Sequence, residues 1–136
     1  MASDRLCRDR KERIVILDTN ALMMLFEFSI DLEAELNRFL GSYCIFVPTI
    51  VLDELRLLSE KGKGKKKIIA KSALTLSKNY KCMQTRLTGS VDESLISLAK
   101  ENDGIVLTND KELRKKLKEM DLKVIFLRAK KKLSMQ

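Results

Sequence analysis

The heptapeptide IVILDTN, residues 14–20, decides the fold of this chain. Four apolar residues, three of them β-branched, run into Asp18, and a helix-favouring segment follows. Such an uninterrupted apolar run is typical of a strand buried on both faces of a parallel sheet. Asp18 would then lie at the carboxyl end of the strand, where open α/β folds place their sites. Taken alone, Asp18 is better explained as the N-cap of the next helix.

Length and composition limit the class of protein. A chain of 136 residues with 45% hydrophobic content predicts one globular domain. Because no apolar run approaches the roughly 18 residues that cross a bilayer, we expect no membrane partner. The first 13 residues are charged and resemble no signal peptide. Three distant cysteines without CxxC spacing argue against a disulfide framework or a zinc site and favour the cytoplasm.

The charged residues narrow the chemistry further. The chain has no histidine, which excludes Ser-His and Cys-His catalysis and leaves carboxylates, lysines and hydroxyls. The net charge is +8, from 27 Lys and Arg against 19 Asp and Glu. This excess favours a polyanionic partner, nucleic acid before an anionic membrane, although many soluble proteins are also basic.

Apolar strands alternate with helical segments along the whole chain. We expect strands near residues 14–17, 43–47, 81–85, 104–107 and 122–127, with helices between them. This alternation predicts right-handed crossovers and a three-layer α/β/α sandwich with a central parallel sheet of four to five strands.

Glu54 lies in the helix expected from Pro48 to Ser59. On a helical wheel four apolar residues of this helix fall within roughly 60° of Glu54, namely Ile50, Val51, Leu57 and Leu58, whereas Asp53 faces water. Burying an unpaired carboxylate costs several kcal/mol, so Glu54 needs a cationic partner. A buried arginine is one candidate and a metal ion is the other, and we favour the metal.

Asp92 and Asp110 also occupy positions with two explanations. Ser90 and Glu93 form a capping box, which accounts for Glu93 but not for an Asp92 that faces inward beside Ala99. Residues 104–110 repeat the opening motif, an apolar strand that ends in a carboxylate. Asn109 with Glu112 could form another capping box, so Asp110 alone is equally well explained as part of a helix start.

Together the four acidic residues predict a metal centre. Asp18 and Asp110 would meet at the carboxyl edge of the sheet, and the inner faces of two helices would bring Glu54 and Asp92 there. Four clustered carboxylates repel one another, and a hard divalent cation removes that repulsion. Oxygen ligands select Mg²⁺ or Mn²⁺. The chemistry that suits such a cluster is metal-assisted hydrolysis of a phosphodiester bond.

The segment KGKGKKK, residues 61–67, lacks the spacing of a P-loop. We interpret it as a flexible basic loop that leads into a helix. Its lysines could bind RNA phosphates or simply form a solvated surface, and the two explanations are equally good. The candidate RNA-binding residues are Lys63, Lys65, Lys66 and Lys67.

Four segments resemble the motifs of PIN-domain nucleases: VILDTNA (15–21), VLDEL (51–55), VDESLI (91–96) and TNDKEL (108–113). The resemblance implies a Mg²⁺- or Mn²⁺-dependent endoribonuclease acting on single-stranded RNA and leaving 5′-phosphate and 3′-hydroxyl ends. By position it makes Asp18, Glu54, Asp92 and Asp110 the catalytic metal ligands, oriented by Asn20 and Thr108. The implied division is a charged extension (1–12), a PIN-like nuclease domain (13–127) and a frayed basic C-terminal tail (128–136) that could contact RNA.

The biological role stays open between two branches of the family. The Gly-Lys segment resembles archaeal and eukaryotic PIN proteins of ribosomal RNA processing, whereas VapC-type toxins share all four acidic positions. Candidate partners are therefore RNA (ribosomal or transfer RNA among the targets), an antitoxin or a ribosome-assembly factor. A homodimer through the apolar residues 23–26 is a further candidate, although core packing explains those residues as well.

Two other classes of protein compete with the nuclease. A non-catalytic RNA-binding or ribosome-assembly module would keep the fold, but it has no reason to keep four acidic positions. A phosphoacceptor receiver domain needs an aspartate after its third strand. Here that strand ends in Gln84-Thr85, so we set the receiver domain aside.

Overall fold

The computed structural model describes residues 12–129 and 131–136 of the chain. Its centre is a six-stranded sheet with the order β3-β2-β1-β4-β5-β6. The first five strands in this order are parallel and β6 is antiparallel to β5. The strands are β1 (Arg13–Leu17), β2 (Tyr43–Pro48), β3 (Lys81–Met83), β4 (Ile105–Leu107), β5 (Val124–Ala129) and β6 (Lys132–Met135). The predicted parallel sheet is confirmed, with one further strand.

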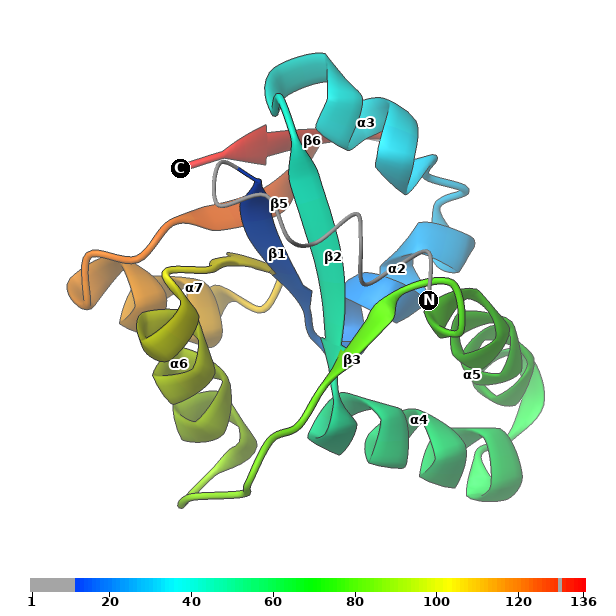
Figure 1. Cartoon of the computed structure of the whole chain (residues 1–136). Helices are drawn as coiled ribbons and strands as arrows, with labels where there is room; N and C mark the ends of the chain where they lie inside the picture. Colours follow the sequence, from blue (N-terminus) through cyan, green and yellow to red (C-terminus); the bar gives the residue numbers. More distant parts are fainter. Residues whose placement is uncertain (1–11, 130) are drawn as a thin grey trace.

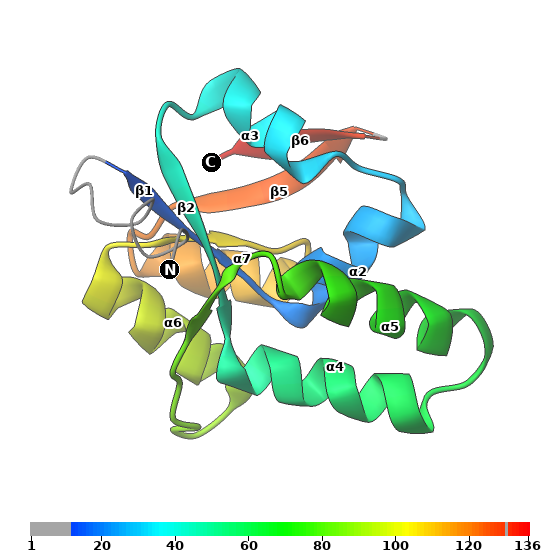
Figure 2. The same cartoon turned by 45° about the vertical axis from the view of Figure 1, so that its right-hand side comes forward.

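Helices cover both faces of this sheet. Figures 1 and 2 show α6 and α7 together on one side and α2 and α5 on the other. From the carboxyl end of β2, α4 extends and packs along α5 as an antiparallel pair. The helices are α2 (Thr19–Glu27), α3 (Leu32–Phe39), α4 (Thr49–Lys61), α5 (Gly64–Ser77), α6 (Val91–Asn102) and α7 (Lys111–Glu119). The α/β/α sandwich predicted from the alternating pattern is confirmed.

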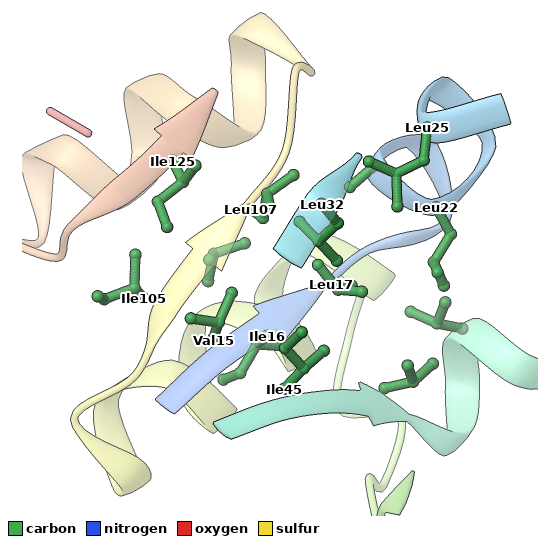
Figure 3. Close-up of a cluster of buried hydrophobic side chains, with 14 of the residues drawn as sticks. Val15, Ile16, Leu17, Leu22, Leu25, Leu32, Ile45, Ile105, Leu107 and Ile125 are labelled. Carbon is green, nitrogen blue, oxygen red and sulfur yellow. The ribbon is translucent and has the colours of Figure 1, made fainter. Parts of the chain in front are cut away.

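The core is built around β1. Val15, Ile16 and Leu17 are completely buried, and Figure 3 shows them between side chains of the neighbouring strands and helices. The run has no apolar-polar alternation because helices cover both faces of the strand. At the entry to β4, a Cβ on Gly104 would lie 2.8 Å from Cδ1 of Ile16, so any larger residue there would require the end of the Ile16 side chain to move. The opening motif therefore occupies the centre of the fold, and Asp18 follows directly.

The C-terminal segment differs from the frayed tail that we expected for residues 128–136. Residues 132–135 form β6, and Leu133 is completely buried. The backbone of Leu133 is held by α3, because its N–H donates to Glu35 Oε1 (2.8 Å) and its carbonyl accepts from Arg38 Nη2. The three consecutive lysines before Leu133 hid this strand in the sequence.

Two local expectations also change. The prediction of a flexible basic loop over residues 61–67 is wrong, because α4 runs to Lys61 and α5 starts at Gly64. Gly62 makes this tight connection possible, since a Cβ there would lie 2.3 Å from Leu58 O. Pro48 ends β2 and is the N-cap of α4, one residue earlier than the helical turn predicted for it. The predicted N-terminal extension lies outside the described residues, apart from residue 12.

The sequence also led to expectations about cysteines and membrane-spanning segments. Cys82 is a free, exposed cysteine. Within the described part of the chain, no helix has the length and apolar character needed to cross a membrane.

Candidate active site

A cavity of about 610 Å³ lies at the carboxyl ends of β1 and β4. All four predicted carboxylates line it, although they come from four separate segments of the chain. The lining residues are Asp18, Thr19, Asn20, Met23, Glu27, Val51, Glu54, Leu58, Lys65, Lys66, Ile69, Val91, Asp92, Leu95 and Asp110. The fold therefore brings the predicted acidic residues to one place, which we call the acidic pocket.

Asp18 is the most buried of these carboxylates, with 6% of its surface exposed. It is the N-cap of α2, and its Oδ1 atom accepts a hydrogen bond from the Ala21 N–H at 2.6 Å. Its Oδ2 atom accepts a hydrogen bond from the Thr108 hydroxyl. The two explanations for Asp18 in the sequence, a helix cap and a pocket residue, are thus both correct.

In the pocket, the charge of one carboxylate affects the pKa of another. Burial raises the pKa of Asp18 to about 6, against the lowering effect of the hydrogen bonds from Thr108 and Ala21. The charges of Asp110 and Asp92 raise it further. The pKa of Asp92 is raised first by burial and then by Asp110, while Lys116, whose Nζ lies 3.8 Å from Asp92 Oδ2, lowers it.

Asp110 also caps a helix while lining the pocket. Its Oδ1 atom accepts hydrogen bonds from the N–H groups of Glu112 (2.9 Å) and Leu113 (3.2 Å) at the start of α7. The capping box predicted from Asn109 and Glu112 is therefore wrong, and Asn109 instead accepts a hydrogen bond from the Leu127 N–H at 3.3 Å. The Asp110 N–H donates to the Thr108 hydroxyl at 3.1 Å.

Glu54 reaches the pocket by a different route from the one predicted. It is exposed, and it accepts a hydrogen bond from the Thr19 hydroxyl. The buried residues of α4 are Val51, Leu55 and Ser59, whereas Leu57 is 52% exposed. Counting Leu57 as a core residue rotated the predicted apolar face toward Glu54, and the actual core face lies to one side of it.

The remaining candidates separate into two groups. Asn20 is exposed and lines the pocket, and Thr108 is completely buried and acts through its hydrogen bonds. Of the four predicted RNA-binding lysines, Lys65 and Lys66 line the pocket from the first turn of α5. Lys63 and Lys67 do not line it.

Sequence reasoning missed three residues of the site. Thr19 was not considered, although it directly follows Asp18. Glu27 lines the pocket with Asn20 and Met23, and the spacing of these three residues along α2 is that of one helical face. That spacing could have identified Glu27. Lys116 comes from α7, and no sequence pattern links it to Asp92.

The donor set of the pocket suits a hard divalent cation, because its charged donors are carboxylate oxygens and it is lined by no thiolate and no imidazole. After burial, the charge of Asp110 contributes to the raised pKa of both Asp18 and Asp92, and a bound cation would relieve this repulsion. Nevertheless, among residues 12–129 and 131–136, no three acidic or cysteine side chains are gathered closely enough to hold one ion as they stand.

A three-layer α/β fold with acidic residues at the carboxyl ends of its central strands defines the class. The chain belongs to the PIN-like domain family, whose pattern it matches over residues 15–130. The resemblance found in the sequence is therefore confirmed. Among named relatives, Ribonuclease VapC4 of Methanocaldococcus jannaschii is 36% identical over 121 residues, which is 86% of this chain and 92% of the relative. Ribonuclease VapC9 of Archaeoglobus fulgidus is 34% identical over 132 residues, 97% of this chain and 95% of the relative.

Solved structures agree on the fold. The PIN domain endonuclease Utp24 superposes with a TM-score of 0.77 at 20% identity and covers 93% of this chain and 92% of its own. VapBC2 from Rickettsia felis, bound to a DNA fragment from its promoter, gives a TM-score of 0.61 at 19% identity, with 85% and 99% covered.

Proposed function

We propose that this chain is a metal-dependent endoribonuclease that hydrolyses single-stranded RNA in the acidic pocket. The observation that carries the proposal is the convergence of Asp18, Glu54, Asp92 and Asp110 on one cavity, with Lys65 and Lys66 at the same cavity. Two relatives at 34–36% identity that are named ribonucleases support it.

In this proposal the four carboxylates hold Mg²⁺ or Mn²⁺. A bound divalent ion of this kind lowers the pKa of water and neutralises charge that develops on the phosphate. Asp18 is held in position by Thr108 and Ala21. The exposed side chain of Glu54 is free to turn into the pocket once its hydrogen bond with Thr19 opens. Side-chain turning of this kind is required, because no three ligands are already gathered in the described residues.

The other pocket residues orient the site and bind the substrate. The Thr108 hydroxyl links Asp18 to the backbone of Asp110, so it fixes the relation between these two carboxylates. Asn20 lies on the exposed side of the pocket, within reach of a substrate. Lys65 and Lys66 contribute positive charge for a phosphate group, which offsets the repulsion of RNA by the carboxylates.

We further propose a VapC-type role with an antitoxin as protein partner and the cytoplasm as the location. Both named relatives carry the VapC name, and the VapBC2 structure has the same fold. Processing of ribosomal RNA has weaker support, since Utp24 shares the fold at only 20% identity. No observation favours a non-catalytic assembly module. A homodimer through residues 23–26 stays a prediction, and within that segment Met24 and Leu25 are buried in the core while Phe26 is 38% exposed.

The experiment that tests this function is cleavage of a single-stranded RNA by the purified protein with Mn²⁺, with Mg²⁺ or with EDTA. We expect cleavage with either metal, none with EDTA, and none with Asp18→Asn. Asp53→Asn is the matched control, because Asp53 is exposed on α4 beside Glu54 and does not line the pocket. Cleavage by Asp18→Asn at the rate of the unmodified protein would contradict the assignment.

A further inference from the structure

A second cavity, of about 490 Å³, lies where α4, α5 and β3 meet. It shares no lining residue with the acidic pocket. Its lining residues are Leu52, Arg56, Lys71, Leu74, Thr75, Ser77, Lys78, Tyr80 and Cys82. We call this site the basic cavity.

Each of the helices α4 and α5 has one face that lines the acidic pocket and another face that lines the basic cavity. On α5 and its C-cap, four residues have the spacing of a single helical stripe and line the basic cavity: Lys71, Leu74, Thr75 and the C-cap Lys78. Lys65, Lys66 and Ile69 form a different stripe of the same helix and line the acidic pocket. The antiparallel helix pair seen in Figure 2 therefore lies between the two cavities, and both helices contribute lining residues to each cavity.

The charges of the two cavities are opposite. The acidic pocket is lined by five carboxylates and two lysines, whereas three cationic side chains and no carboxylate line the basic cavity. Arg56 pairs with Asp53 at 3.2 Å, but both side chains are largely exposed, so this ion pair is weak and easily exchanged. Within residues 12–129, neither Lys71 nor Lys78 forms a salt bridge. The cavity thus has uncompensated positive charge.

Tyr80 gives the basic cavity an aromatic surface. Burial is the main reason that the pKa of Tyr80 is raised, to about 12, and the charges of Glu33 and Asp31 raise it further. The phenol is neutral at physiological pH and does not repel an anion. Leu52 and Leu74 add apolar surface beside it. Cationic side chains next to an aromatic ring are the combination that binds single-stranded nucleic acid, with phosphates on the cations and bases on the ring.

We propose that the basic cavity binds a nucleotide of single-stranded RNA away from the cleavage site, with its phosphate on Arg56, Lys71 and Lys78 and its base against Tyr80. Lys66 and Lys78 are separated by 12 residues of α5, or roughly 18 Å along the helix axis. A strand that occupies both cavities must span this distance, so a dinucleotide occupies only one of them. The inference rests on the proposed function, because it assumes that RNA is the substrate.

The exposed thiol of Cys82 provides a direct readout, because it lines the basic cavity. The rate of Cys82 alkylation is measured by peptide-resolved mass spectrometry, with and without a single-stranded RNA of about 12 nucleotides. EDTA is present throughout, so the RNA stays intact. We expect the RNA to slow alkylation several-fold, and a dinucleotide at the same nucleotide concentration to slow it less, because the dinucleotide can occupy only one of the two cavities. Equal rates with and without the longer RNA would overturn the proposal.

Two variants show which side chains are responsible. Lys71→Gln with Lys78→Gln should abolish the protection of Cys82 and lower the salt dependence of RNA binding by about 0.7 in the log-log slope per lysine. Lys100→Gln with Lys118→Gln is the matched control, because these exposed lysines lie on α6 and α7 and line neither cavity. Equal loss of protection in both pairs would overturn the assignment. So would protection by a polyglutamate peptide but not by RNA, because it would indicate an acidic protein as the occupant.

The outcome is separable from that of the proposed function. Protection of Cys82 requires binding and no cleavage. If RNA protects Cys82 but is never cut with any metal, the cleavage proposal fails and the basic cavity stands. If RNA is cut and Cys82 is never protected, the basic cavity fails alone.

Discussion

The Thr108 hydroxyl donates a hydrogen bond to Oδ2 of Asp18, a residue 90 positions earlier in the chain. Thr108 follows β4 and Asp18 follows β1, so the bond joins the carboxyl ends of two adjacent parallel strands. The same hydroxyl accepts the Asp110 N–H. One buried side chain therefore sets the positions of two proposed metal ligands.

Replacing Thr108 with Val should harm both stability and activity. The isosteric change leaves Asp18 Oδ2 without its hydrogen bond, which should lower the free energy of unfolding by about 1–3 kcal/mol. Urea denaturation at about pH 8 measures this, because Asp18 is ionised there. Thr108→Ser keeps the hydroxyl and is the control. Equal stability of the Val and Ser variants would show that the hydrogen bond contributes nothing.

Without metal, Asp18→Asn should be more stable than the unmodified protein at neutral pH. The pKa of Asp18 is raised from 3.8 to about 6, so the folded protein loses stability as the pH rises through this range and the carboxylate ionises. The variant escapes this loss. Its advantage should be near zero below about pH 4, grow up to about pH 6 and level off above about pH 7, at no more than about 3 kcal/mol. Chemical denaturation in EDTA at several pH values checks the profile, and an advantage that shrinks with rising pH would contradict it.

Added Mn²⁺ should raise the thermal midpoint of the unmodified protein, because a ligand that binds only the folded state stabilises it. We expect Glu54→Gln to weaken this stabilisation and Asp53→Asn to leave it unchanged, since only Glu54 lines the acidic pocket. Differential scanning fluorimetry across a metal titration provides the measurement. If both variants respond to Mn²⁺ as the unmodified protein does, Glu54 is not a ligand.

The four lysines between residues 63 and 67 should differ in their effect on RNA. Lys65→Ala with Lys66→Ala should weaken binding and reduce its salt dependence, because these two side chains line the acidic pocket. Lys63→Ala with Lys67→Ala removes the same charge from positions outside the pocket and should have the smaller effect. Fluorescence anisotropy over a range of salt concentrations compares the pairs, and identical curves would indicate a non-specific lysine surface.

Shortening the buried Leu133 should destabilise the whole domain. Leu133→Ala removes a completely buried side chain and should cost about 2–5 kcal/mol of unfolding free energy. Lys131→Ala is the control, because this neighbouring residue is exposed. Urea denaturation followed by circular dichroism tests the pair. Similar midpoints for both variants would indicate that β6 is dispensable.

Prediction from the sequence is most accurate where a local pattern also shows which faces of an element are buried in the fold. The unbroken apolar run of β1 requires burial on both faces, and this placed Asp18 at the sheet edge correctly. Glu54 was correctly predicted to line the pocket, but for a partly wrong reason. A helical wheel of α4 does not show which face packs against the core until the neighbouring elements are known. The contact of Thr19 with Glu54 joins two elements, and no spacing along the chain predicts it.

Other features depend on contacts that sequence patterns do not describe. The backbone of Leu133 is hydrogen-bonded to the side chains of Glu35 and Arg38, which lie almost 100 residues earlier in the chain. The basic cavity likewise needs α4 and α5 to pack side by side before Arg56 and Lys71 line one space. The helical spacing of the cavity residues on α5 can be recognised in the sequence, but the packing of α4 against α5 cannot.

Asp18 and Asp110 are each both helix caps and pocket carboxylates. Asparagine caps a helix about as well as aspartate does, yet it carries no charge. Over evolutionary time, a descendant that no longer needed the chemistry could therefore change to Asn at either position and keep its fold. Asn at 18 or 110 in a related sequence would thus mark a lineage that retained the scaffold after giving up hydrolysis, whereas loss of Asp92, which caps no helix, would leave no such trace.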